Sequence, residues 1–327
     1  RLRTNTVSNT AFRGFGGPQG MLAIEHVMDQ VAHRLGIDPF DLRMRNLYGP
    51  DRDVTPYGMT VFDNIAPEVM EKTEALSNYR ARRRRIAEHN AENPFLRKGL
   101  AITPVKFGIS FTATHLNQAG ALVHVYTDGS VHLNHGGTEM GQGLFTKVAQ
   151  VVADEFGIDI GKVKITATTT AKVPNTSPTA ASSGTDLNAM AARIAAAHIR
   201  ERLADFAAET YDGVAAEVRF RDSQVFVGNR SVEFAALVRQ AYMARISLSS
   251  TGLYRTPKSH WDREKGQGRP FFYFAYGASC SEVTIDILTG ELRVDRVDIV
   301  HDVGKSLNPA IDIGQIEGGF VQGMSWL

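Results

Sequence analysis

The sequence predicts an α+β fold in which helices and strands are mixed without a repeating order. Up to residue 97, apolar residues recur with helical spacing between clear start and stop signals. After residue 98, β-branched runs are separated by turn residues. The length of 327 residues, 43% of them hydrophobic, is also enough for two domains of about 150 residues each. We therefore expect one domain over 1–97, ending in a connecting helix, and a second over 98–327.

The composition argues against several classes of protein. Thirty-six Lys and Arg balance 35 Asp and Glu, so net charge favours neither nucleic acid nor a membrane surface as a partner. No apolar run approaches about 18 residues, so we expect no membrane span, and we find no secretory signal. A single cysteine, Cys280, favours a reducing compartment, the cytoplasm. The ends at Arg1 and Leu327 suggest a fragment of a longer polypeptide.

Two helices are predicted near the N-terminus from their end signals. Pro18 and Gly36 bracket an amphipathic segment over 18–35. Asp38 is a predicted N-cap, and Pro39 is the first residue of a shorter helix that ends before Gly49-Pro50. A loop over 48–64 is expected to follow.

A single charged helix is predicted over 66–90, closed by Asn93-Pro94. It contains four consecutive arginines, 82–85, a pattern that can also bind nucleic acid. Because glutamates at 71, 74, 88 and 92 balance these charges, we interpret the run as a solvated helix face.

Strands are predicted from residue 98 onward. Strands are expected over 98–109 and 119–126, and Asp128-Gly129 is a hairpin turn into a strand over 131–134. The remaining expected elements are, in order, a helix over 142–156, a strand over 163–167, a helix over 186–208, a hairpin of 272–287 with 291–300, and a final helix over 311–324.

Three glycine-rich stretches, 13–20, 136–143 and 177–184, each precede a predicted helix. Helix N-termini expose unpaired N–H groups and glycines admit a ligand to the backbone, so each is a candidate anion or cofactor loop, with a tight turn as the alternative. Gln19 stands where a dinucleotide fingerprint needs its third glycine. Polar side chains suited to a heteroaromatic redox cofactor are Gln142, Ser182, Ser183 and Gln315.

Acid–base and nucleophilic catalysis have no clear candidates. The ten histidines show no tight metal-ligand spacing, and Cys280 lies in an alternating strand that favours packing. Glu139, Glu282 and Glu317 lie near the motifs without a recognisable partner. Phe15, flanked by glycines, is suited either to stacking on a planar substrate or to the core.

Four motifs carry a resemblance to a known family. TAFRGFGGPQ at 10–19, GGTEMGQG at 136–143, NTSPTAAS at 175–182 and NPAIDIGQ at 308–315 are similar, in this order, to the molybdopterin-binding region of the xanthine dehydrogenases, in the xanthine oxidase family of molybdenum hydroxylases. The resemblance runs essentially end to end. It implies that 1–97 is the C-terminal part of a first molybdenum-cofactor-binding domain and that 98–327 is a second such domain, truncated at its C-terminus.

The resemblance also implies ligands and their contact residues. A molybdopterin cofactor is expected, and its molybdenum is ligated by the pterin rather than by the protein. The matching cofactor-binding positions are Arg13, Gly141, Gln142, Ala181, Ser182, Ser183, Gly184 and Gln315. A purine is expected between two phenylalanines, and the matching substrate-binding positions are Phe15, Phe111, Thr112, Ala180 and Ala181.

The implied activity is an oxidoreductase that hydroxylates hypoxanthine and xanthine to urate, with water as the oxygen source. Phe111 favours a purine over an aldehyde, and aldehyde oxidase or another molybdenum hydroxylase is the alternative. The family's general base is expected beyond Leu327, so no catalytic residue is assigned, and the isolated chain is expected to be inactive, or a non-catalytic module. Two [2Fe-2S] clusters, FAD and NAD are expected on other domains or subunits, in a dimer of the complete enzyme.

Overall fold

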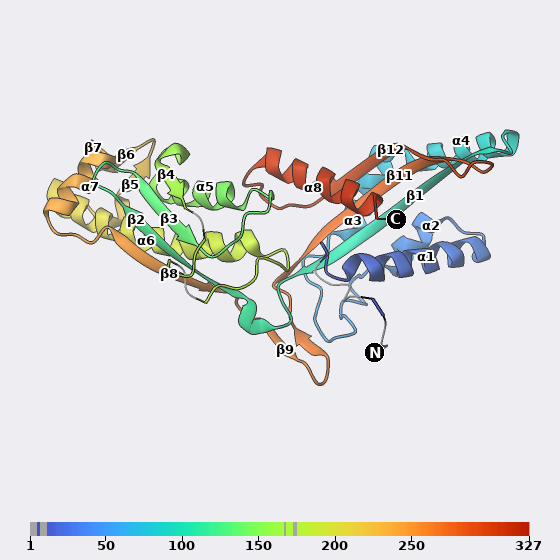
Figure 1. Cartoon of the computed structure of the whole chain (residues 1–327), viewed down its shortest axis with the longest axis horizontal. Helices are drawn as coiled ribbons and strands as arrows, with labels where there is room; N and C mark the ends of the chain where they lie inside the picture. Colours follow the sequence, from blue (N-terminus) through green and yellow to red (C-terminus); the bar gives the residue numbers. More distant parts are fainter. Residues whose placement is uncertain (1–4, 7–11, 167, 173–174, 327) are drawn as a thin grey trace. The chain divides into compact units, whose positions relative to one another are not determined.

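A computed structural model describes residues 5–6, 12–166, 168–172 and 175–326. The chain divides into two compact units, and each unit is built from two separate stretches of sequence (Figure 1). Unit 1 combines Arg1–Ile109 with Asp262–Gly304, and unit 2 combines Ser110–Trp261 with Lys305–Leu327. Both contain helices and sheets, which confirms the predicted α+β class. The expected boundary at 97/98 lies inside unit 1, within its first strand.

Unit 1 is organised around a three-stranded antiparallel sheet in the order β1–β11–β12. Its strands are β1 (Leu96–Ile109), β11 (Tyr273–Asp286) and β12 (Leu292–His301), and its helices are α1 (Gly17–Leu35), α2 (Pro39–Asn46), α3 (Ala66–Ser77) and α4 (Tyr79–Glu92). Met70, Tyr79 and Ile102 lie in the buried core between helices and sheet. Cys280 is fully buried there, and burial raises the pKa of its thiol, so its predicted packing role is confirmed.

The end signals of the first two helices work as predicted. Asp38 Oδ1 accepts the backbone N–H of Phe40 at 2.8 Å, and Gly36 ends α1 in the left-handed region at φ 65°. The single helix expected over 66–90 is wrong. Asn78 adopts φ 51° and divides the segment into α3 and α4, because a left-handed residue cannot continue a right-handed helix.

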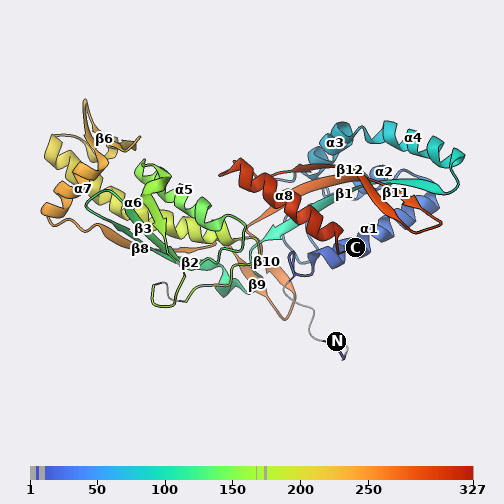
Figure 2. The same cartoon turned by 45° about the horizontal axis from the view of Figure 1, so that its top comes forward.

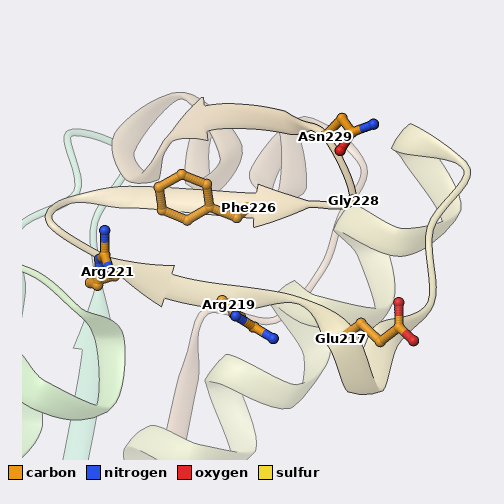
Figure 3. Close-up of a pocket in the computed structure, with 6 residues that line it drawn as sticks. All are labelled: Glu217, Arg219, Arg221, Phe226, Gly228 and Asn229. Carbon is orange, nitrogen blue, oxygen red and sulfur yellow. The ribbon is translucent and has the colours of Figure 1, made fainter.

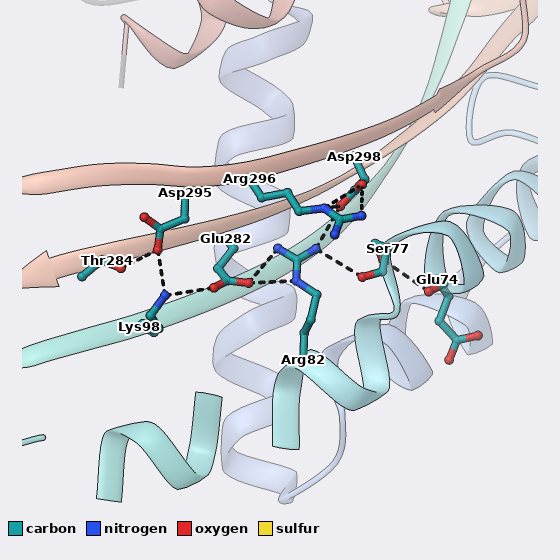
Figure 4. A network of polar contacts seen from close by, with 9 residues as sticks. All are labelled: Glu74, Ser77, Arg82, Lys98, Glu282, Thr284, Asp295, Arg296 and Asp298. Atoms are coloured by element: carbon teal, nitrogen blue, oxygen red, sulfur yellow. Dashed lines mark hydrogen bonds and ion pairs between the residues drawn. The ribbon is translucent and has the colours of Figure 1, made fainter. Parts of the chain in front are cut away.

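The interpretation of the arginine run as a solvated face is wrong for Arg82. Its side chain is only 4% exposed. Its Nε donates to Glu282 Oε2 at 2.8 Å, and its Nη1 donates to Asp298 Oδ2 at 2.9 Å (Figure 4). The compensating carboxylates therefore come from β11 and β12, about 200 residues away, where local sequence reasoning could not find them.

Unit 2 contains a four-stranded sheet in the order β4–β3–β2–β8, along which α5 and α6 lie (Figure 2). The parallel pair is β3 with β4, and the other pairs are antiparallel. The elements are β2 (Gln118–Val125), β3 (Val131–His135), α5 (Leu144–Phe156), β4 (Val163–Ile165), α6 (Gly184–Tyr211), β8 (Ser249–Arg255) and α8 (Pro309–Met324). Val123, Leu133, Phe156 and Ile199 are fully buried in its core.

Several elements were not predicted. A small antiparallel sheet in the order β5–β6–β7 adjoins α7 within unit 2. The unpredicted elements are β8, given above, together with β5 (Arg219–Arg221), β6 (Gln224–Val227), β7 (Arg230–Glu233), α7 (Phe234–Met243), β9 (His260–Asp262) and β10 (Gln267–Arg269). The strand predicted over 163–167 ends at Ile165, and Ala167 lies outside the described residues, as do residues 10 and 11 of the first motif. In the described part of the chain, no helix has both the length and the apolar character needed to cross a bilayer.

Candidate functional site

The second and third glycine-rich stretches contact each other in unit 2. The backbone N–H of Thr138 donates to Thr179 Oγ1 at 2.8 Å. Glycine permits this approach, since a Cβ on Gly137 would lie 2.5 Å from Leu144 Cδ2 and 2.8 Å from Asn188 Nδ2. Leu144 begins α5 and Asn188 lies in the first turns of α6, so the loops meet where both helices start.

The start of α8 lies against the second loop and the first turn of α5. A Cβ on Gly143 would lie 2.6 Å from Ile311 Cδ1, and Lys147 Nζ lies 2.7 Å from Asp312 Oδ1. Asn308 caps the helix by accepting the N–H of Ile311 at 3.3 Å. Three helix N-termini, with their partial positive charge, are thus gathered around the two loops. Gln315 is half-buried in the second turn of α8.

Gln142 is held by its own loop. Its Oε1 accepts the N–H of Met140 at 2.6 Å, and its Nε2 donates to the carbonyl of Thr138 at 2.8 Å. The neighbouring Gly141 has φ 92°, a conformation that side chains rarely adopt. Because an amide has two donors and two lone pairs, Gln142 keeps one donor and one lone pair for a ligand.

The third loop enters α6 through two consecutive left-handed residues, Ala181 and Ser182, at φ 55° and 56°. Each costs about 1–2 kcal/mol for a residue with a Cβ, and such strain is typical of functional loops. Ser183 is buried, and its hydroxyl donates to the carbonyl of Ala180 at 3.3 Å rather than capping the helix. Gly184 is the first residue of α6.

The first loop, which carries Arg13 and Phe15, belongs to unit 1. Phe15 lies between Gly14 and Gly16, and all three have positive φ, 44° at Phe15. Its ring is 75% exposed, and the side chain of Arg13 is also exposed. The ring of Phe107 covers Gly17, where a Cβ would lie 3.0 Å from Phe107 Cε2. The predicted stacking ring is therefore presented to solvent on a tightly packed loop.

Phe111 belongs to unit 2 and is half-buried. Asn117 fixes its backbone, accepting its N–H at 2.7 Å and donating to its carbonyl at 2.9 Å. Thr112 and Ala180 are exposed. Because the two phenylalanines lie in different units, the predicted purine clamp stays a prediction.

Two residues in or directly before the second loop, Glu139 and His135, were not predicted to have a role. His135 is buried, and its Nδ1 accepts the N–H of Gly137 at 3.1 Å. Burial lowers the pKa of His135 to about 4, so the ring is neutral at pH 7. Glu139 accepts backbone N–H groups of the loop, which explains why it has no acid–base partner. The sequence signal available for both was their position in or next to the glycine-rich stretch 136–143.

The donor set fits a large organic cofactor. It consists of backbone N–H groups, an amide and hydroxyls. Two buried polar atoms beside these loops, His135 Nε2 and Asn188 Oδ1, have no hydrogen-bond partner among the described residues. The described residues contain no group of three or more His, Cys, Asp or Glu side chains placed to bind a metal ion. Donors of this kind can bind a cofactor through hydrogen bonds.

A separate pocket lies on the small sheet of unit 2 (Figure 3). Its volume is about 630 Å³, and it is lined by Glu217, Arg219, Arg221, Phe226, Gly228 and Asn229. Arg219 and Phe226 are register partners on β5 and β6. The charged side chains of this pocket are exposed, and none of its residues was predicted to bind a ligand.

Comparison with known proteins gives consistent matches. Two family models, both described as a molybdopterin cofactor-binding domain, match residues 72–327 and 1–47. Xanthine dehydrogenase/oxidase from Felis catus is 49% identical over 322 residues, covering 98% of this chain and 23% of that protein. Nicotinate hydroxylase from Emericella nidulans is 44% identical over 328 residues, with the same two coverages of 98% and 23%.

A solved structure shares the fold. Quinoline 2-oxidoreductase from Pseudomonas putida 86 matches with a TM-score of 0.80 at 26% identity, covering 94% of this chain and 40% of that one. The chain thus spans about a quarter of the length of the curated relatives it matches.

Proposed function

This chain belongs to the molybdopterin cofactor-binding domain family, and on that premise we propose that it forms the cofactor- and substrate-binding portion of a xanthine dehydrogenase. The observation that carries the proposal is the meeting of two glycine-rich loops with the start of α8 in unit 2. Lys147 of α5 and Asp312 of α8 are 165 residues apart in sequence, yet their side chains are hydrogen-bonded beside these loops. A shared ligand gives a physical reason for that arrangement.

We assign the cofactor contacts by chemistry. Gln142 and Gln315 supply amide donors and acceptors, and Ala181 to Gly184 supply backbone N–H groups at the start of α6. Gly141 admits the cofactor to the loop backbone, and Arg13 is the proposed positively charged contact. When bound, molybdopterin supplies the metal centre for the two-electron oxidation of a substrate carbon. The protein's part is to bind and orient the cofactor and the substrate.

The proposed substrate is a purine. The relatives named above act, by name, on xanthine, nicotinate and quinoline, which are all planar nitrogen heterocycles. Phe15 and Phe111 are suited to stack on such a ring, with Thr112, Ala180 and Ala181 beside it. Stacking favours any of these rings. Hypoxanthine and xanthine are the first choice because Phe111 matches the xanthine dehydrogenases, and nicotinate or an aromatic aldehyde is the alternative.

The wider setting of the activity is also proposed. Electrons would leave through two [2Fe-2S] clusters and FAD to NAD on other domains or subunits of a dimeric, cytoplasmic enzyme of purine catabolism. The general base would come from outside this chain. On its own the chain would then bind cofactor and substrate without turning the substrate over.

Molybdenum content is the decisive measurement. The natural polypeptide that carries this sequence should contain about one molybdenum per chain, measured by elemental mass spectrometry, because the loops bind one cofactor. It should oxidise hypoxanthine and xanthine faster than nicotinate or an aromatic aldehyde. Faster turnover of nicotinate or the aldehyde would change the substrate assignment, and a metal-free, inactive polypeptide from a cofactor-producing host would contradict the proposal.

A further inference from the structure

We propose that Glu139 is a positioning residue of the cofactor site: its carboxylate binds the backbone of the second glycine-rich loop and thereby holds Gln142 in its binding position. This inference rests on the proposed function, since Gln142 is a proposed cofactor contact. Glu139 itself is assigned no contact with the cofactor and no catalytic step.

The hydrogen bonds of Glu139 define the role. Its Oε1 accepts the N–H of Gly141 at 2.9 Å and that of Gly143 at 3.1 Å, and its Oε2 accepts the N–H of Phe145 at 2.9 Å. Phe145 is the second residue of α5. One carboxylate therefore ties Gly141 and Gly143 to the first turn of the helix, where the N–H groups have no partner within the helix.

The charge of Glu139 suits this place. Burial raises the pKa of its carboxyl, but the backbone N–H donors outweigh burial, so the pKa lies below its usual value. Near neutral pH the side chain is an anion at a helix N-terminus, where the helix dipole stabilises it. A carboxylate held by three N–H donors is a poor proton acceptor, which argues for positioning over acid–base chemistry.

Gln142 is the residue that this arrangement fixes. It lies between Gly141 and Gly143, which have φ 92° and 73° and whose N–H groups are both bound by Glu139. The amide of Gln142 in turn bonds to Thr138 and Met140, the two neighbours of Glu139 in sequence. The two side chains thus hold the loop from opposite ends, and neither set of bonds is expected to persist without the other.

The test is a double-mutant cycle in the natural polypeptide, with Glu139→Gln, Gln142→Ala and the double variant. Glu139→Gln keeps the shape but removes the charge and one acceptor oxygen. Each single variant should weaken molybdenum retention on dialysis by about 10- to 100-fold, the usual effect of losing a group that orients a ligand. The double variant should lose no more than Gln142→Ala alone, because Glu139 acts through Gln142.

A second readout does not depend on the loaded protein. Hydrogen exchange in the cofactor-free polypeptide should be faster in Glu139→Gln at the amides of Gly141, Gly143 and Phe145, and also at Met140, whose N–H donates to Gln142 Oε1. It should be unchanged outside this loop and the first turn of α5. The matched control is Glu209→Gln, an exposed carboxylate near the end of α6, which should match the wild type in both measurements. If Glu139→Gln does not fold, Glu139→Asp keeps the charge on a shorter side chain and should show the same changes to a smaller extent.

The outcomes separate this inference from the proposed function. Wild-type molybdenum retention in Glu139→Gln, or additive losses in the double variant, would overturn the positioning role and leave the proposed function standing. A wild-type polypeptide without molybdenum would instead remove the proposed function. Unchanged amide exchange in Glu139→Gln would overturn the inference in either case.

Discussion

His135 combines a hydrogen-bonding role with a fixed charge state. Its Nδ1 accepts the N–H of Gly137, so the neutral ring carries its proton on Nε2. The ring also packs edge-on against Phe145, with 5.1 Å between ring centroids. His135 therefore links the first residues of the second loop to the helix that follows it. Protonation of Nδ1 would remove the acceptor and place a charge in the core.

Acid should therefore destabilise the protein through His135. The unfolded imidazole takes up a proton near pH 6.5, whereas the buried one does so only at about 4. The stabilising contribution is complete above pH 6.5 and is lost as the pH falls toward 4, to a total of about 3 kcal/mol. His135→Asn keeps an acceptor for Gly137 and does not titrate, so its free energy of unfolding in urea should vary less over this interval. Equal pH dependence in both proteins would contradict the assignment.

Strained residues at the site escape sequence analysis. Phe15 could be singled out because glycines flank it, and its φ of 44° follows from the need to turn the chain there. Ala181 and Ser182 are not flanked by glycines, and no local sequence signal marks their left-handed conformation. Glu139 was set aside as a base for lack of a partner, and its bonds to the backbone are invisible in a sequence.

Among the elements, helix ends marked by proline and glycine were predictable, and breaks without such signals were not. Asp38-Pro39 begins α2 through a side-chain bond within two residues, which local sequence specifies. The hairpin turn at Asp128-Gly129 likewise leads directly into β3. The three strands β5, β6 and β7 have three or four residues each and mix polar or charged residues with apolar ones, so they are too short for a periodicity to mark them.

The break between α3 and α4 depends on the conformation of Asn78. At φ 51° and ψ 40°, asparagine is tolerated, whereas a residue with a larger or branched side chain is strained. Asn78→Val should lower the free energy of unfolding by about 1–2 kcal/mol, and Asn78→Gly should leave it near the wild-type value. Urea denaturation followed by circular dichroism measures both. A destabilising glycine together with a neutral valine would show that another feature sets the break.

At the scale of the whole molecule, contacts between distant segments determine how the chain divides into two units. The pattern of helices and strands in the sequence predicted this division only in part. The change from helices to strands near residue 98 is real, but β1 pairs along its whole length with β11, about 180 residues later. Unit 1 is therefore completed only by residues 262–304. The motifs predicted a common ligand because they resemble those of one family. Their contacts with each other, such as that of Thr138 with Thr179, join segments far apart in sequence and could not be predicted from local patterns.

Arg82 joins the two segments of unit 1. It bonds to Glu282 and Asp298, which also pair with Lys98 at 3.1 Å and Arg296 at 2.6 Å. Figure 4 shows these side chains meeting between α4 and the sheet. Removing one member of a buried ion pair leaves an uncompensated charge, which usually costs about 3–5 kcal/mol. Because Lys98 and Arg296 remain, we expect the lower end of that range.

Arg82→Ala should therefore reduce the free energy of unfolding by about 3 kcal/mol, with faster hydrogen exchange along β11 and β12. Arg85→Ala is the matched control, since Arg85 is an exposed member of the same run and should change the free energy by less than about 0.5 kcal/mol. Denaturant titration of both variants gives the comparison. Equal effects would mean that the buried arginine stabilises unit 1 no more than its exposed neighbour, and that strand pairing and apolar packing hold residues 262–304 against the N-terminal segment.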